Sequence, residues 1–167
     1  NICRDWGEVA LRCRRLASAL AKRGVKKGDT VALIAPNIPE ALECALAVPM
    51  IGAVLNANNI RLDARTLGYI LEHGEASVLL VDTEFSQLAR EAVALSGRRL
   101  LMIDIEDSEG PGGDRIGELT YEALLAEGSD DFPYTLPDDE WDALALNYTS
   151  GTTGQPKGVV YSHRGAW

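Results

Sequence analysis

Hydrophobic residues are arranged in two ways along the chain, at helical spacing and in short continuous runs, and these arrangements predict helices and strands. Between residues 5 and 22, apolar side chains recur every three or four positions, and Gly24 follows, which predicts an amphipathic helix. Residues 30–35 are a nearly unbroken apolar run, as expected for a strand that is buried on both faces. The very apolar segment 39–51 predicts a second helix, placed deep in the core.

The same order of strand and helix repeats further along the chain. Expected strands cover residues 53–56, 77–82, 99–103 and 141–148, and expected helices cover residues 63–73, 84–95 and 120–127. Strands that alternate with helices of this length are typical of parallel crossover units. We therefore expect an α/β fold with a largely parallel sheet, interrupted by a solvated loop over residues 104–118.

Composition and charge narrow the class of protein. The chain has 167 residues, of which 46% are hydrophobic and 25% charged, as in ordinary globular domains, and its apolar runs fall far short of the roughly 20 residues of a membrane span. A net charge of -9 argues against nucleic-acid binding through phosphate neutralisation. Cys3, Cys13 and Cys44 are widely spaced without a CxxC pair, which predicts a reduced, cytoplasmic protein.

A run of glycine, hydroxyl and lysine residues directly follows the last expected strand. It reads YTSGTTGQPKG over residues 148–158. The glycines allow successive backbone N–H groups to turn toward an anion, the hydroxyls are further donors, and Lys157 adds a positive charge. Ligands of open α/β sheets bind at the ends of strands, so this segment is a candidate site for a polyanion.

Two better-known phosphate motifs do not fit this segment. The P-loop requires G-x-x-x-x-G-K-[ST], but counting from Gly151 the sixth residue is Pro156, and Gly158 follows Lys157. The dinucleotide pattern G-x-G-x-x-G fails as well, because Gly151 and Gly154 have no third glycine at the required spacing. A simple hairpin between two strands would use the same turn-forming residues, so the residues alone leave that alternative open.

The segment resembles the phosphate loop of the adenylate-forming, or AMP-binding, superfamily, which includes acyl-CoA synthetases, luciferases and the adenylation domains of peptide synthetases. The similarity extends to GDTVA at residues 28–32, GAVLN at 52–56 and ILEH at 70–73. Within the superfamily the chain looks closest to fatty acyl-CoA synthetases of the medium-chain, long-chain and methylmercaptopropionate-activating groups. The resemblance, with a first residue that is not Met, implies that residues 1–167 are the N-terminal part of the large domain.

The resemblance implies a ligase that converts a carboxylic acid, expected to be a fatty acid, and ATP into an acyl-adenylate and then into a CoA thioester. ATP, magnesium and CoA would be required. A homodimer is one assembly compatible with the sequence. The family's magnesium glutamate, ribose aspartate, acyl pocket and C-terminal lysine all follow the loop, so this segment alone is not expected to complete the reaction. The alternatives are an aryl-CoA ligase and a truncated, noncatalytic nucleotide-binding remnant.

The resemblance also implies roles for single residues. ATP phosphates would be bound by Thr149, Ser150, Gly151, Thr152, Thr153, Gly154 and Lys157. Lys157 and Thr152 would act in catalysis, Lys157 by neutralising the β- and γ-phosphates, and the Thr149 hydroxyl would lie near magnesium. Gly158 would let the chain turn back into the next strand.

Five other residues have structural interpretations. Asp63 is expected to cap the start of the helix over residues 63–73, and His73 to close its end, where a cation is favoured by the helix dipole. His163 is expected to cap a following helix, and Arg61 to lie on the surface. Trp141 is expected to pack in the core rather than stack on adenine.

Overall fold

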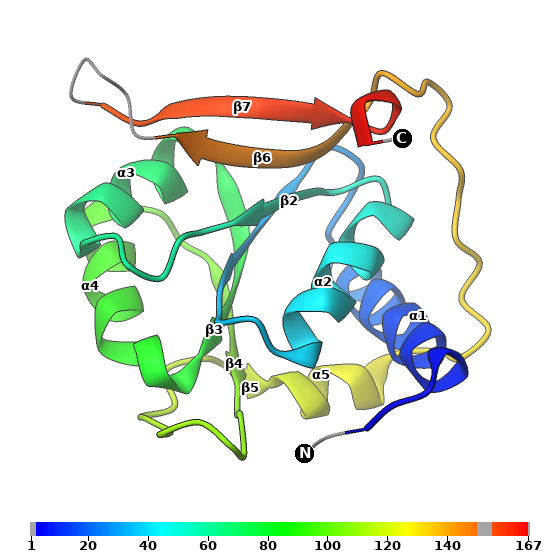
Figure 1. Ribbon diagram of the computed structural model, residues 1–167, viewed down its shortest axis with the longest axis horizontal. Coiled ribbons are helices and arrows are strands. Elements are labelled where there is room, and N and C mark those ends of the chain that lie inside the picture. Colours follow the sequence, from blue (N-terminus) through cyan, green and yellow to red (C-terminus); the bar gives the residue numbers. More distant parts are fainter. Residues whose placement is uncertain (1–2, 150–154, 167) are drawn as a thin grey trace.

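The fold is a seven-stranded sheet with helices on both faces (Figure 1). The structure is a computed structural model and describes residues 3–149 and 155–166. In chain order the strands are β1 Thr30–Ile34, β2 Val54–Ala57, β3 Ala76–Asp82, β4 Leu101–Ile105, β5 Leu119–Thr120, β6 Ala143–Thr149 and β7 Lys157–Ser162. The helices are α1 Trp6–Lys22, α2 Pro39–Met50, α3 Ala64–His73, α4 Ser86–Ser96 and α5 Tyr121–Glu127, with short 3-10 turns at Thr83–Phe85 and Arg164–Ala166.

The spatial order of the strands is β5-β4-β3-β1-β2-β6-β7. Every neighbouring pair is parallel except β6 and β7, which are antiparallel. The chain passes from β1 through α2 to β2, and then through α3 to β3 on the far side of β1. The predicted α/β fold with a largely parallel sheet is therefore confirmed.

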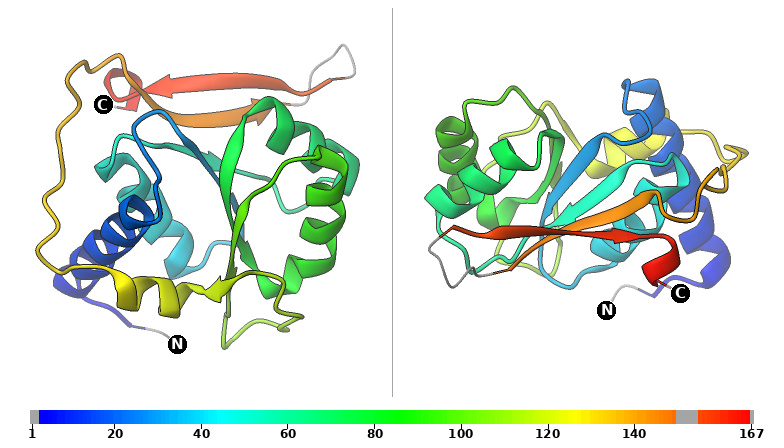
Figure 2. Two further views of the ribbon diagram at one scale, coloured as in Figure 1. Left: turned by 180° about the vertical axis from the view of Figure 1, so that it is seen from behind. Right: turned by 90° about the horizontal axis from the view of Figure 1, so that it is seen from above.

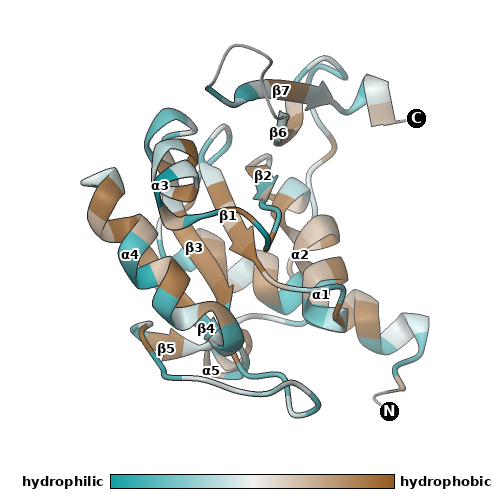
Figure 3. Cartoon of the chain, turned by 60° about the vertical axis from the view of Figure 1, so that its left-hand side comes forward, coloured by the Kyte–Doolittle hydropathy of each residue, from teal (hydrophilic) through white to brown (hydrophobic). Residues whose placement is uncertain are grey.

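Alternate residues of the central strands feed two separate cores, because successive side chains of a strand point to opposite faces. Val31 and Leu33 pack with α1, α2 and α5, whereas Ala32 and Ile34 pack with α3 and α4. Figure 2 shows these two helical layers on opposite sides of the sheet, and Figure 3 shows the apolar central strands between them. Both faces are covered, which explains why these strands are apolar throughout.

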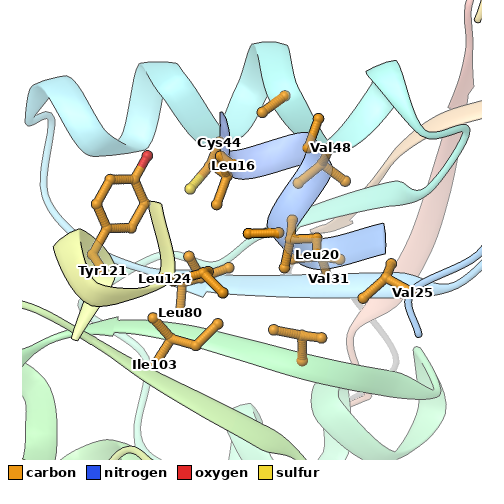
Figure 4. Packing of buried hydrophobic residues seen from close by; sticks show 14 of the residues in the cluster. Leu16, Leu20, Val25, Val31, Cys44, Val48, Leu80, Ile103, Tyr121 and Leu124 are labelled. Atoms are coloured by element: carbon orange, nitrogen blue, oxygen red, sulfur yellow. The ribbon is translucent and has the colours of Figure 1, made fainter. Parts of the chain in front are cut away.

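The first core contains closely packed aliphatic side chains around one polar group. Leu16, Leu20 and Leu124 are fully buried there together with Tyr121, whose exposed fraction is 2% (Figure 4). The Tyr121 hydroxyl donates to Glu43 Oε2 at 2.8 Å. The layer formed by α1, α2 and α5 thus encloses a charged residue.

Glu43 is the centre of a buried ionic network, with 1% of its side chain exposed. Its Oε1 accepts hydrogen bonds from Arg4 Nη1 and from Arg12 Nε, both at 2.7 Å. Arg12 also pairs with Glu122 on α5. The network therefore joins the N-terminal segment, α1, α2 and α5.

Two predicted element positions need correction, and one strand was not predicted. The expected strand over residues 99–103 is β4, which begins and ends two residues later. Its buried Asp104 is satisfied, because its carboxylate accepts hydrogen bonds from the N–H groups of Ile116 and Gly117. The two-residue β5 was not predicted, since it is too short to show a period. The expected helix over residues 84–95 begins as the 3-10 turn Thr83–Phe85 and continues as α4.

Two expectations about burial are wrong. Helix α2 is not surrounded by the core: Leu42 and Leu46 are 48% and 42% exposed, because one face of the helix packs on the sheet and the other does not. Trp141 does not pack in the core, since it is 70% exposed. It lies in the turn before β6, where its backbone N–H donates to Asp139 Oδ1.

The predictions for the two ends of α3 and for Arg61 are confirmed. Asp63 is the N-cap of α3, with its Oδ1 accepting from Thr66 N at 2.8 Å. His73 is the last residue of α3, and Arg61 is exposed. Among the described residues, none of the helices combines the length and the hydrophobicity that a membrane span requires.

The cysteines provide a test of the packing. Cys13 and Cys44 are buried and Cys3 is exposed, all three as free thiols. Burial, followed by the nearby Glu43 carboxylate, raises the pKa of Cys13 to about 11, and burial raises the pKa of Cys44 as well. Because the thiolate is the reactive form, iodoacetamide at pH 8 is expected to modify Cys3 in the folded protein and to leave Cys13 and Cys44 unmodified.

Site-resolved mass spectrometry would measure this pattern, with the protein in denaturant as the control in which all three cysteines react. Rapid modification of Cys44 before unfolding would show that α2 does not pack as described.

Candidate functional site

The glycine- and hydroxyl-rich segment connects the two strands of an antiparallel hairpin. Strands β6 and β7 pair Tyr148 with Gly158 and Thr149 with Lys157. The hairpin extends across the end of the molecule (Figure 1). The simple-hairpin geometry considered from the sequence is therefore correct for the two strands, and the candidate phosphate segment starts and ends at paired positions.

Two of the predicted site residues lie in the described part of the chain. Thr149 is the last residue of β6, Lys157 is the first of β7, and both are exposed. Directly opposed residues of an antiparallel pair extend to the same face, so the hydroxyl and the ammonium group share one side of the hairpin. Five predicted residues lie outside the described residues: Ser150, Gly151, Thr152, Thr153 and Gly154.

The opposite face of the hairpin rests on the end of α3. The Tyr148 hydroxyl and His73 Nδ1 are joined by a hydrogen bond of 2.7 Å, and their rings meet edge to face with centroids 5.8 Å apart. The His73 ring also stacks on Tyr69, at 5.3 Å between centroids. Partial burial, with the neighbouring Tyr69, raises the pKa of Tyr148 above its ordinary value, so this phenol stays protonated at neutral pH.

Gly158 has a different role from the predicted one. It lies within β7, opposite Tyr148, rather than in a turn. A Cβ atom at this position would lie 3.1 Å from Leu146 Cδ1 and 3.4 Å from the Tyr148 ring. The missing side chain therefore leaves room for Tyr148 to lie against the hairpin.

The part of β6 around Ala145, away from the phosphate segment, is bound to β2. The register of the β2–β6 ladder pairs Leu55 with Ala145. Asn56, which is fully buried, donates from Nδ2 to the Leu146 carbonyl at 2.7 Å, and Asn58 Nδ2 donates in turn to Asn56 Oδ1. A buried amide that is satisfied in this way specifies one arrangement of its neighbours, so β6 is held beside β2 in a defined position.

A hollow of about 690 Å³ lies between α3 and the end of the phosphate segment. Its lining residues are Arg65, Thr66, Tyr69, Glu72, Leu95, Gln155 and Pro156. This volume is within the range of small-molecule sites. The described end of the candidate segment, Gln155 and Pro156, thus borders this hollow.

The remaining sequence candidates lie outside this geometry. At the turn Arg164–Ala166, the side chain that accepts a hydrogen bond from Gly165 N is the Ser162 hydroxyl rather than the His163 imidazole. The backbone N–H of His163 donates to the Asp142 carbonyl. The expected cap at His163 is therefore wrong. In the described residues, no group of three His, Cys, Asp or Glu side chains is placed to hold a metal ion.

The contact between His73 and Tyr148 was not predicted from the sequence. The two residues are 75 positions apart, and each had a sufficient local explanation, a helix end and a strand. The spacing of Tyr69 and His73 on one helix face was the available signal, because residues four apart on a helix are neighbours.

The chain is similar to a family of enzymes over nearly its whole length. The family model described as "AMP-binding enzyme" matches residues 4–167. The peroxisomal acetate/butyrate–CoA ligase of Arabidopsis thaliana is 48% identical over 97% of the chain and 31% of its own length. The peroxisomal trans-cinnamate:CoA ligase of Petunia hybrida is 44% identical over 97% of the chain and 31% of its own length.

A solved structure shows the same fold. The anthranilate CoA ligase in complex with anthranoyl-AMP superimposes with a TM-score of 0.83 and 27% identity, over 94% of this chain and 29% of that chain. The chain therefore spans about 30% of the length of the relatives it matches.

Proposed function

The chain belongs to the AMP-binding enzyme family, and we propose that the protein activates a carboxylic acid with ATP and transfers it to coenzyme A. The observation that carries this proposal is the hairpin that pairs Thr149 with Lys157 on one exposed face, at the two ends of a segment rich in glycine and hydroxyl groups. Such a segment suits a triphosphate because backbone amides, hydroxyls and an ammonium group all bind phosphate oxygens.

The proposed reaction has two steps. In the first, a carboxylate oxygen of the acid attacks the α-phosphorus of ATP, the bond from that phosphorus to the bridging oxygen breaks, and pyrophosphate leaves. In the second, the CoA thiol loses its proton and attacks the acyl carbonyl, and AMP leaves with the electron pair of the broken C–O bond. Negative charge gathers on the pyrophosphate during the first step, so preplaced donors and cations there lower the barrier.

The proposed roles of single residues follow from this charge distribution. Lys157 neutralises the β- and γ-phosphates, and Thr152 donates to the same group. Ser150, Gly151, Thr153 and Gly154 complete the phosphate cradle. These roles are supported by the match of YTSGTTGQPKG to a phosphate-binding loop and, for Lys157, by its exposed place at the start of β7.

Magnesium is proposed as the companion of ATP. It would supply further neutralisation of the phosphate oxygens. The Thr149 hydroxyl is an exposed oxygen at the mouth of the segment, and magnesium binds oxygen ligands, largely water and phosphate in nucleotide sites. Thr149 therefore fits a position next to the ion.

The proposed substrate is a monocarboxylic acid with an aliphatic chain. The support is the 48% identity to a ligase named for acetate and butyrate and the 42% identity to one named for 2-methylpropanoate. An aromatic acid is the second candidate, supported by the relatives named for trans-cinnamate and anthranilate. These names favour short aliphatic acids over long fatty acids.

The test is acid-dependent release of pyrophosphate by the native protein, with ATP, magnesium and one acid at a time. The panel contains acetate, butyrate, 2-methylpropanoate, decanoate, palmitate and cinnamate, and omission of the acid is the control. We expect the highest kcat/KM with a short aliphatic acid, followed by thioester formation when CoA is added. Nucleotide binding without acid-dependent pyrophosphate release would instead identify a noncatalytic nucleotide-binding module.

A further inference from the structure

The end of β6 at Tyr148 packs on the C-terminal end of α3. Tyr148 lies three residues beyond Ala145, the ladder position that pairs with β2. The Tyr148 hydroxyl lies 2.7 Å from His73 Nδ1, and the two are hydrogen-bonded. Gly74 follows, and a Cβ there would lie 3.2 Å from Leu146 Cδ2 and 3.3 Å from the Tyr148 hydroxyl. The helix end and the strand therefore fit closely.

Helix α3 is a firm base for this contact. Leu67 and Leu71 are buried in the core formed with the sheet and α4, and Ile70 is buried as well. Gly68 brings α3 so near to α4 that a Cβ would lie 2.9 Å from the Ala92 carbonyl oxygen. The His73 ring is further held by its stack on Tyr69, one turn earlier. Its position is thus set by the core rather than by the hairpin.

The contact at Tyr148 also sets the direction of its neighbour. Successive side chains of a strand point to opposite faces, so a strand that is held by Tyr148 against α3 turns Thr149 to the other face, beside Lys157. Gly158 supports the same arrangement, because it leaves space for the Tyr148 ring between the strand and the helix. Rotation of β6 about its axis would move both Thr149 and the start of the phosphate segment.

We propose that His73 is a positioning residue for nucleotide binding. Through Tyr148 it holds the end of β6 in the orientation from which the phosphate segment can enclose a triphosphate. His73 touches neither nucleotide nor acid in this role. The inference rests on the proposed function for its ligand, ATP, but not on the identity of the acid.

Loss of the contact has a measurable consequence. Without it, the hairpin end must be ordered when the nucleotide binds, and the free energy of that ordering is subtracted from the binding free energy. A single hydrogen bond contributes about 0.5–1.5 kcal/mol, which corresponds to a change of about two- to tenfold in the dissociation constant. The effect belongs to ATP binding and the first step, since the second step starts after pyrophosphate has left.

The experiment compares His73→Ala, Tyr148→Phe and the double variant in the native protein. Titration calorimetry with a non-hydrolysable ATP analogue and magnesium gives the dissociation constant. Kinetics give kcat, the KM for ATP and the rate of thioester formation from supplied acyl-adenylate. Each single variant is expected to weaken nucleotide binding about two- to tenfold, the double variant no more than either, and thioester formation is expected to stay unchanged.

Two further variants separate positioning from general stability. In His73→Asn the side-chain amide lies near the place of Nδ1, so binding should recover in part. His163→Ala, which removes an imidazole remote from Tyr148, should leave the dissociation constant unchanged.

Unchanged binding in both single variants, additive losses in the double variant, or equal losses in both reaction steps would overturn the inference. Altered analogue binding without any acid-dependent turnover would retain the role of His73 and refute only the proposed ligase reaction.

Discussion

Replacement of Lys157 by alanine is expected to slow formation of the acyl-adenylate by about 100- to 1,000-fold, the usual effect of removing one preplaced group that stabilises transition-state charge. Lys157 begins β7, is exposed, and is paired with Thr149 across the hairpin. Its ammonium group would face the charge that collects on the leaving pyrophosphate. The rate of pyrophosphate release under saturating acid and ATP measures this effect.

The second step provides the internal control for this variant. When the acyl-adenylate is supplied, no pyrophosphate leaves, so Lys157→Ala should form the thioester at nearly the normal rate. Lys157→Arg keeps the positive charge and should lose less in the first step than Lys157→Ala. If both steps slow equally in Lys157→Ala, the assignment of this lysine to the leaving phosphates is wrong.

Replacement of Glu43 by alanine is expected to lower the free energy of unfolding by about 3–5 kcal/mol, the usual cost of removing one partner from a buried ionic network. Glu43 has 1% of its side chain exposed and accepts from Arg4, Arg12 and the Tyr121 hydroxyl. Without it, two guanidinium groups and a phenol lose their common partner inside the α1, α2 and α5 layer. Chemical denaturation followed by far-UV circular dichroism measures the loss.

Glu122 offers a matched control on the rim of the same network. It pairs with Arg12, but its side chain is 64% exposed, and exposed ion pairs contribute about 0–1 kcal/mol. Glu122→Ala should therefore destabilise the protein by about 1 kcal/mol or less. Equal effects of the two substitutions would mean that the Glu43 site is open to water and that the network does not hold the helices together.

Local patterns predicted most of the fold because the forces that form its elements are local or periodic. The apolar run that became β1 and the Asp63 cap of α3 were both found in the sequence. The sequence was misleading where burial depends on neighbours from distant segments. Helix α2 is apolar enough to suggest a central helix, yet Leu42 and Leu46 are exposed and Glu43 is buried, because arginines from α1 and the N-terminal segment neutralise it.

The site was predictable to a different extent in its two parts. Lys157 and Thr149 could be predicted as phosphate-binding residues because such a loop is built from consecutive residues, and these roles stay predictions. The hairpin register pairs the two residues. The contact between His73 and Tyr148 could not be found, since it depends on how α3 packs on α4 and on where β6 pairs with β2. The prediction for Trp141 was wrong for a related reason: its aromatic ring suggested a core position, but the described residues leave it 70% exposed.

In the proposed reaction this segment holds ATP so that a carboxylate attacks the α-phosphorus. An acid labelled with oxygen-18 in its carboxylate tests this step, with the native protein, ATP, magnesium and CoA, and mass spectrometry of the products. We expect that AMP gains one labelled oxygen and that pyrophosphate gains none, because the attacking oxygen remains on AMP when the thiol displaces it. Label in inorganic phosphate, with ADP as the nucleotide product, would place the attack on the γ-phosphorus and refute the proposed reaction.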